Sequence, residues 1–133
     1  MTRYEYQAYL RSDEWKRLRT RVRRRARGRC ERCHVNQRTD VHHLTYERVG
    51  REELSDLIGV CGGCHNALHG RSQYDPRTCA EHLTDDEKKV LFGMHQSWSD
   101  CYIKTGARSM GACEYWTDRQ RSVLDKWKRA GGI

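Results

Sequence analysis

Two short stretches, CERC at residues 30–33 and CGGCHNALH at residues 61–69, decide how this chain of 133 residues folds. Each contains a Cys-x-x-Cys pair, and two such pairs supply the four thiolates of a tetrahedral zinc site. We therefore predict that one structural Zn²⁺ is bound by Cys30, Cys33, Cys61 and Cys64. The alternative is a pair of redox or disulfide motifs, which is less favoured because nothing in the sequence marks a secreted chain.

A bound metal ion would also stabilise a chain with little hydrophobic material. Only 36% of the residues are hydrophobic and 33% are charged, so the core must be small. Small cores usually need a disulfide, a metal ion or a partner to fold stably.

Four of the histidines in or beside the segment that the cysteine pairs enclose are candidates for metal binding or catalysis. His65 and His69 are four residues apart, so on a helix they share one face. His42 and His43 lie between the two cysteine pairs. Two imidazoles from a helix and one from a neighbouring strand can bind a metal ion and leave positions open for water or phosphate. The alternative is that these four are ordinary surface histidines. This alternative is less favoured because all four occur in one segment.

Residues from about 9 to 69 resemble the HNH endonucleases, in particular the small phage and prophage members. The matching stretches are YLRSDEW at 9–15, the two cysteine pairs, HHLTYER at 42–48, DLI at 56–58 and HNALH at 65–69. The resemblance implies an α+β fold with a ββα-metal core, in which a short hairpin and a helix hold one catalytic divalent cation. We expect this core at residues 30–70, between a basic helical arm at 1–29 and a helical C-terminal appendage at 71–133.

The resemblance also implies roles for individual residues. His42 corresponds to a metal ligand and His43 to the general base. His65 and His69 would complete the ligand set of the catalytic cation. Asp56 stands where the family has an asparagine that steadies the loop behind the base, and an ionised carboxylate there can accept hydrogen bonds but cannot donate them.

The expected reaction is hydrolysis of phosphodiester bonds in double-stranded DNA, by nicking or cutting. A neutral imidazole, with a reference pKa of ~6.5, can take a proton from the attacking water. The cation would stabilise the charge on the phosphate and on the departing 3′ oxygen. The resemblance implies products with 5′-phosphate and 3′-hydroxyl ends. Three imidazoles favour Mn²⁺, Co²⁺, Ni²⁺ or Zn²⁺ over Mg²⁺. The alternatives are a zinc-ribbon module that binds nucleic acid without catalysis and an RNase of the same type.

The net charge of +8 is concentrated at the N-terminal end. Residues 1–30 contain 11 Lys or Arg and 3 Asp or Glu, whereas the remaining residues contain 15 of each. A concentrated run of arginine is typical of a surface that binds a phosphate backbone, although a solvated helix face is the alternative. For Arg48, an ion pair with Glu52 or Glu53 competes with a phosphate contact. The arginines that we expect to contact DNA are Arg17, Arg19, Arg23, Arg24, Arg27 and Arg48.

Local signals predict the secondary structure around these motifs. Residues 12–27 form a helix that Ser12 caps and Gly28 ends. Strands are expected at 38–43 and 57–60, and helices at 85–98 and from 118 to about 130 after capping boxes at Thr84 and Thr117. The apolar face of the first helix consists of Trp15, Leu18, Val22 and Ala26.

Two further expectations concern location and the remaining cysteines. No apolar run approaches the ~18 residues of a membrane span, and no hydrophobic leader follows Met1. We therefore expect no membrane partner and a cytoplasmic location in a bacterial or phage-infected host cell, as a monomer or a dimer. Buried free cysteines are the simpler expectation beyond the core, and a second zinc site is the alternative for Cys79, His82, Cys101 and Cys113.

Overall fold

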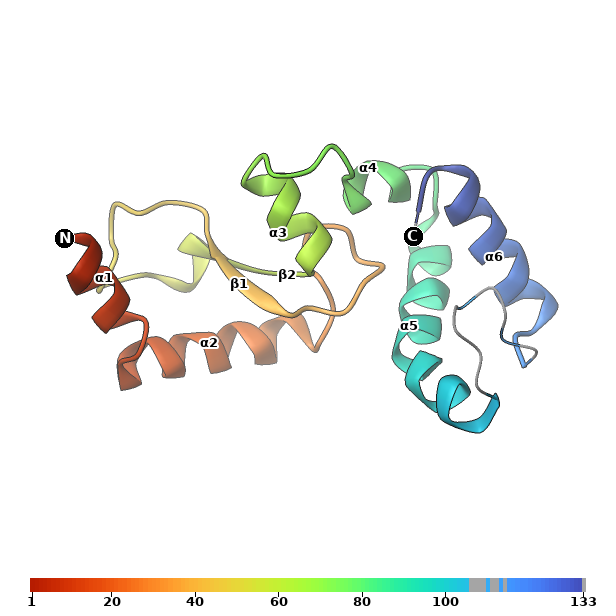
Figure 1. The fold of residues 1–133 in the computed structure, drawn as a ribbon, viewed down its shortest axis with the longest axis horizontal. Helices are drawn as coiled ribbons and strands as arrows, with labels where there is room; N and C mark the ends of the chain where they lie inside the picture. The colour runs from red at the N-terminus through yellow and green to blue at the C-terminus, as the bar shows by residue number, and fades with distance from the viewer. Residues whose placement is uncertain (106–109, 111–112, 114, 133) are drawn as a thin grey trace.

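The computed structural model describes residues 1–105, 110, 113 and 115–132, with the side chains of 98–105 excepted (Figure 1). The fold combines helices with a two-stranded antiparallel sheet made of β1 (Asp40–His43) and β2 (Leu57–Val60). Helix α2 (Asp13–Ala26) runs along one side of this hairpin and helix α3 (Gly62–Leu68) lies on the other (Figure 1). The predicted mixture of helices and a short hairpin is therefore confirmed.

Helix α2 forms as its sequence predicts. The Ser12 hydroxyl accepts a hydrogen bond from the Trp15 backbone N–H at 3.3 Å, and Asp13 and Glu14 occupy the first turn. The helix ends at Arg27, which adopts the left-handed conformation with φ 54°, one residue before the expected stop at Gly28. Gly28 continues the turn at φ 78°. The apolar face of α2 packs on the hairpin, and a cluster forms around the buried side chains of Trp15, Val22 and Leu57.

A short helix, α1 (Arg3–Tyr9), precedes α2 and was not predicted. Its N-terminus is a capping box in which Thr2 and Glu5 bond each other's backbone N–H groups at 3.1 and 2.7 Å. The T-x-x-E pattern that signals such a box is present in the sequence. None of the α1 residues is fully buried, yet the helix brings Tyr6 and Tyr9 to the hairpin.

The register of the hairpin separates two neighbouring histidines. His42 pairs with Ile58 and His43 with Leu57. Because successive side chains on a strand point to opposite faces, His42 faces α3 and His43 faces α2. The ring contacts agree, since His42 lies 5.4 Å from His65 of α3 and His43 lies 4.9 Å from Trp15 of α2, measured between ring centroids.

The other regular elements of the described chain are helical. A single turn of 3₁₀ helix, η1 (Leu54–Asp56), leads into β2, and α4 (Pro76–Ala80) follows α3. Helices α5 (Asp85–Thr105) and α6 (Asp118–Arg129) pack against each other, and α5 runs seven residues past its predicted end. The capping boxes predicted at Thr84 and Thr117 are both present. Within the described parts, no helix is long and apolar enough to cross a bilayer.

The C-terminal helices share a core with the cysteines of the N-terminal half. One continuous cluster of buried side chains contains the four predicted zinc ligands together with Leu91 and Met94 of α5 and Leu124 and Trp127 of α6. His95 of α5 also bonds through Nδ1 to the backbone oxygen of Val35, at 2.5 Å. The appendage therefore packs directly against the cysteine cluster.

Candidate metal centres and nucleic-acid interface

The four cysteines meet in one buried cluster. Their sulfur atoms all lie within 4.8 Å of one another. The Sγ atoms of Cys33 and Cys61 are 3.9 Å apart, close to the ~3.8 Å expected between two sulfurs bound at 2.3 Å to a tetrahedral ion. The backbone N–H groups of Cys33 and Cys64 donate to the sulfurs of Cys30 and Cys61, at 3.5 and 3.4 Å. The predicted set is confirmed as a cluster that could hold a zinc ion.

The three predicted histidine ligands also converge. His42 comes from β1, His65 from α3 and His69 from the residue that caps α3, and their ligand atoms lie within 4.8 Å of one another. The Nε2 atoms of His65 and His69 are 3.0 Å apart. Burial and the two neighbouring imidazoles lower the pKa of His42, which favours the neutral form that binds metal. His69 is exposed, so the cluster is open to solvent on one side.

Asp40 contacts this histidine cluster, although the sequence reasoning did not single it out. It lies two residues before His42 on β1 and therefore on the same face of the hairpin. Its Oδ2 is 3.4 Å from Nδ1 of His65. A carboxylate at that nitrogen orients the ring so that Nε2 points toward the other two histidines, as in many metal sites.

His43 does not join the metal cluster. Its side chain is 3% exposed and stacks between Trp15, at 4.9 Å, and Tyr46, at 5.3 Å between ring centroids. Tyr6 of α1 approaches the same ring at 6.1 Å. The proposed general base is therefore enclosed by aromatic side chains on the face of the hairpin opposite to the three ligands.

A buried carboxylate that the sequence reasoning missed holds His43 in place. Glu52 Oε2 lies 2.8 Å from His43 Nε2, while Oε1 accepts hydrogen bonds from the Tyr9 hydroxyl at 2.5 Å and the Gly50 N–H at 2.8 Å. Burial raises the pKa of Glu52, but the bonds from Tyr9 and His43 outweigh it and lower the pKa. The ionised carboxylate accepts from His43, so Nε2 carries the proton and Nδ1 is the nitrogen left to accept one.

Asp56 supports the loop between the strands rather than the ring of His43. It accepts two hydrogen bonds from the Arg48 guanidinium, one of them from Nε at 2.9 Å, and one from the Glu53 N–H at 3.0 Å. Arg48 also lies 4.0 Å from Glu53 but has no ion pair with Glu52 in the described structure. Asp56 thus supports the loop through Arg48. The main partner of Arg48 is Asp56 itself, whereas the sequence suggested a phosphate contact or an ion pair with Glu52 or Glu53.

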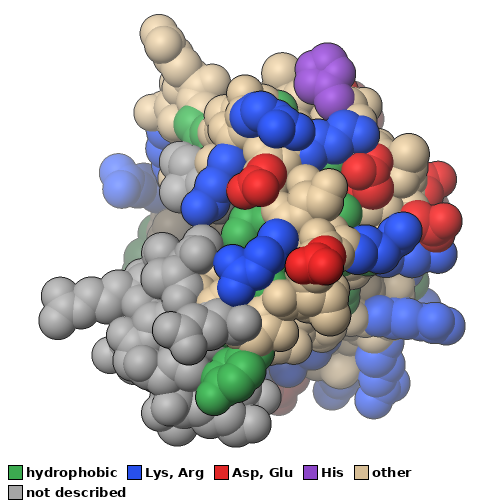
Figure 2. All heavy atoms as spheres, turned by 90° about the vertical axis from the view of Figure 1, so that its right-hand side faces the viewer, with side chains coloured by type: hydrophobic (Ala, Val, Ile, Leu, Met, Phe, Trp, Pro, Cys, Tyr) green, Lys and Arg blue, Asp and Glu red, His purple; other side chains and the backbone are tan. Residues whose placement is uncertain are grey.

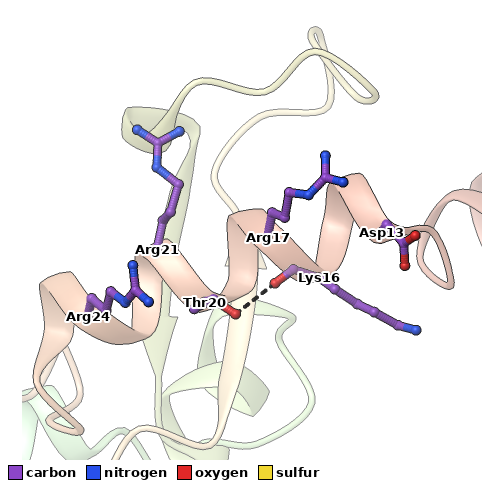
Figure 3. A pocket seen from close by; sticks show the side chains of 6 residues that line it. All are labelled: Asp13, Lys16, Arg17, Thr20, Arg21 and Arg24. Atoms are coloured by element: carbon purple, nitrogen blue, oxygen red, sulfur yellow. Dashed lines mark hydrogen bonds between the residues drawn. The ribbon is translucent and has the colours of Figure 1, made fainter.

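The basic residues of α2 are divided between two surfaces. On the face opposite the apolar stripe lies a groove whose cationic lining faces solvent (Figure 3). Of the arginines expected to contact DNA, Arg17 and Arg24 lie in this groove with Lys16 and Arg21. Arg19 and Arg23 lie on the flank of α2, and their charges act on Arg38. Arg27 is the exposed residue that caps the helix.

Not every arginine of α2 faces a potential ligand. Arg25 bonds both carboxylate oxygens of Glu31 at 2.8 and 2.7 Å, and it donates to the carbonyl oxygens of Leu54 and Leu57 at 2.8 Å. This side chain therefore fastens α2 to the hairpin. The C-terminal face of the molecule carries interspersed acidic and basic side chains instead of a basic surface (Figure 2).

The alternative second zinc site lies partly outside the described residues, because it includes the side chain of Cys101. Within that part, the only groups of three or more potential metal ligands are the four cysteines and the three histidines. Cys79 is a buried free thiol and Cys113 is disulfide-bonded. The side chain of Cys101 lies outside the described residues.

Comparison with known proteins adds no relative. No protein-family model matches the chain, and no curated protein or solved structure does. The features that indicate a function are therefore the two ligand clusters, the enclosed His43 and the basic surfaces.

Proposed function

We propose that this protein is a metal-dependent endonuclease of the HNH type that hydrolyses phosphodiester bonds of duplex DNA. The observation that carries the proposal is the convergence of His42, His65 and His69 from a strand and a helix into one open cluster. A structural zinc site does not require these imidazoles, because the four cysteines already provide a complete tetrahedral set of ligands.

The residues of the histidine cluster would bind and orient one divalent cation. Such an ion, when bound, supplies charge stabilisation for the phosphate and for the leaving oxygen. Three neutral imidazoles leave coordination positions free and favour Mn²⁺, Co²⁺, Ni²⁺ or Zn²⁺ over Mg²⁺. Asp40 fixes the ring of His65 through Nδ1, which keeps Nε2 directed at the ion.

His43 would act as the proton acceptor through Nδ1. Glu52 keeps the other nitrogen protonated and fixes the ring plane, while Trp15 supports one face of the ring. Tyr46 stacks on the other side and is itself 56% exposed. Catalysis therefore requires Tyr46 to move from the ring so that water and phosphate can reach Nδ1.

One observation favours a second candidate, a zinc-ribbon module that binds nucleic acid without cleaving it. The His43 side chain is almost completely enclosed and lies on the opposite face of the hairpin from the three ligands. In such a module His43 is a structural residue that joins α2 to the loop, and the basic face of α2 alone contacts the phosphate backbone.

Nicking of supercoiled plasmid distinguishes the two functions. The wild-type protein is tested with Mn²⁺, Co²⁺, Ni²⁺, Zn²⁺ and Mg²⁺ beside His42→Ala and His43→Ala, and a structured RNA is tested under the same conditions. His82→Ala is the matched control, because His82 is exposed and outside both clusters. We expect ligatable nicks from the wild type and the control only. DNA binding without cleavage by any of the four proteins would establish the binding module, and cleavage of RNA alone would change the substrate.

Titration with Co²⁺ gives a readout that does not depend on activity. Thiolate ligands produce an intense charge-transfer absorption, so the first equivalent of Co²⁺ reports the cysteine cluster. We expect a second, weaker-binding equivalent that His42→Ala loses and His82→Ala retains. A single equivalent in the wild type would refute the metal site at His42, His65 and His69.

A further inference from the structure

We propose that Arg19, Arg23 and Arg38 form a binding site for a backbone phosphate of nucleic acid at the edge of the hairpin. Arg19 and Arg23 belong to α2, and Arg38 lies just before β1. The site deepens the proposed function and rests on it, because it specifies where the nucleic acid that enters the histidine cluster is held. Arg38 was not among the arginines that the sequence indicated.

The backbone and side chain of Arg38 are held firmly by the fold. Its N–H donates to the Gly28 carbonyl oxygen at 2.9 Å, and the next residue, Thr39, donates to the Val60 carbonyl oxygen at 2.9 Å. The side chain lies across Gly59 of β2, where an added Cβ would approach Arg38 Cδ to 2.7 Å. A glycine at 59 thus leaves the space that the arginine occupies.

This arginine lacks the partners that a structural arginine has. Its Nε is buried and has no hydrogen-bond partner in the described structure. Burial, followed by the charges of Arg23 and Arg19, lowers the pKa of Arg38. By contrast, Arg25 on the opposite flank of α2 uses its guanidinium for four hydrogen bonds.

The nearby acids, Glu31 and Asp40, offset the charge of the three guanidinium groups only in part, because each has another partner. Glu31 is paired with Arg25 at 2.7 Å and accepts the Gly59 N–H at 2.8 Å. Asp40 is directed at His65, 3.4 Å away. In the described part of the chain, none of the three arginines forms a salt bridge, so like charges lie near one another at a partly buried position. A guanidinium fork fits the oxygens of a phosphate, which would relieve this repulsion.

The position of the site relates it to the metal cluster. Asp40 lies between the two features, because its charge acts on Arg38 and its carboxylate contacts the cluster ligand His65. Because Arg38 lies over Gly59, which pairs with Val41 on the α2 face, a nucleic-acid strand with one phosphate at the histidines would pass around the edge of the hairpin to reach the three arginines. The groove with Arg21 and Arg24 lies on the face of α2 that points away from the hairpin.

Binding of a labelled DNA duplex without added divalent cations tests the site separately from cleavage. Dissociation constants are measured by fluorescence anisotropy at several salt concentrations for the wild type, Arg38→Gln, Arg38→Lys and Arg23→Gln. Arg129→Gln is the matched control, because it removes the same charge from an exposed position on α6, away from the arginines that are expected to contact DNA. Circular dichroism and the Co²⁺ spectrum establish that each variant is folded.

We expect Arg38→Gln to weaken binding about tenfold and to lower the slope of log K against log salt by about 0.9, as loss of one phosphate contact should. The affinity of Arg38→Lys should lie between those of the wild type and Arg38→Gln, because an ammonium keeps the charge but lacks the two-pronged geometry of a guanidinium. Arg23→Gln should resemble Arg38→Gln, so the test stands even if one variant does not fold. The Arg129→Gln control should change affinity less than threefold.

Three outcomes would overturn the site. They are a wild-type affinity and slope for both Arg38→Gln and Arg23→Gln, an equal loss in Arg129→Gln, and saturable binding of inorganic phosphate with unchanged DNA affinity in Arg38→Gln. A reduced salt slope in Arg38→Gln, together with an absence of plasmid nicking by the wild-type protein, would support the phosphate site and reject the nuclease function. The two proposals can thus fail independently.

Discussion

Replacement of Glu52 by glutamine tests how the protein would prepare His43 for catalysis. The carboxylate is fully buried and accepts three hydrogen bonds, two at Oε1 and one at Oε2. A glutamine can accept from Tyr9 and Gly50 with its oxygen, and its NH₂ group then faces Nε2 of His43. His43 must accept that bond, so its proton moves to Nδ1, the nitrogen that should take a proton from water.

The expected effects on rate and stability differ in size. Loss of a general base lowers the rate about 10²- to 10⁴-fold. The fold should lose only about 1–3 kcal/mol, since charge-assisted bonds are replaced by neutral ones. Because the pKa of Glu52 is lowered in the folded protein, its contribution to stability is present above the unfolded pKa of about 4.3 and is lost as the pH falls through the lower folded value. Glu52→Gln should remove this part of the acid sensitivity.

The assay is initial-rate nicking of supercoiled plasmid with Mn²⁺ at saturating and subsaturating DNA, beside thermal unfolding at pH 7 and pH 4. A positioning role predicts a fall in kcat with little change in KM. Glu53→Gln is the matched control, because the Glu53 side chain is 69% exposed and its described contact to Arg48 spans 4.0 Å. A folded Glu52→Gln variant that nicks within threefold of wild type would refute the role assigned to the His43–Glu52 pair.

Three further predictions concern the metal clusters and the C-terminal helices. Cys33→Ser should lose the tightly bound metal and the cooperative unfolding transition seen by circular dichroism, because metal binding at four thiolates supplies folding free energy; a strong chelator should reproduce the effect on the wild type. Asp40→Asn should weaken metal binding at the histidine cluster about 10- to 100-fold in a chelator competition, with the cysteine site unchanged as internal reference. Burial lowers the pKa of His95, so its contribution to stability is present above about 6.5 and is lost as the pH falls through the lower folded pKa. Unfolding by urea between pH 8 and pH 5 should therefore show a smaller loss of stability in His95→Phe than in the wild type.

Local sequence signals predicted the elements that local interactions form. Helix α2 starts at Ser12 because its hydroxyl reaches the backbone of Trp15, and the boxes at Thr84 and Thr117 act within four residues. The cysteine cluster was predictable for a related reason, since each Cys-x-x-Cys turn is local and zinc chemistry joins the two turns. The extra length of α5 was not predictable from its start signal alone.

Contacts between distant segments were not predictable in the same way. Alternation along a strand would have placed His42 and His43 on opposite faces, had it been applied to the pair. Nothing in the spacing of Glu52 and Tyr9, which are 43 residues apart, indicates that they meet at His43. Two contacts distinguish Arg38 from other surface arginines. Its backbone N–H donates to the Gly28 carbonyl oxygen, and its side chain lies across Gly59.

The contact between Arg38 and Gly59 has an evolutionary consequence. Any side chain at position 59 would occupy the volume of the Arg38 stem, so the pair should be inherited together. Among natural homologues, a larger residue at 59 should accompany a shorter residue at 38 and a compensating cation elsewhere along the strand. Covariation of these two positions, once enough homologous sequences have been aligned, would therefore indicate that this packing contact is under selection.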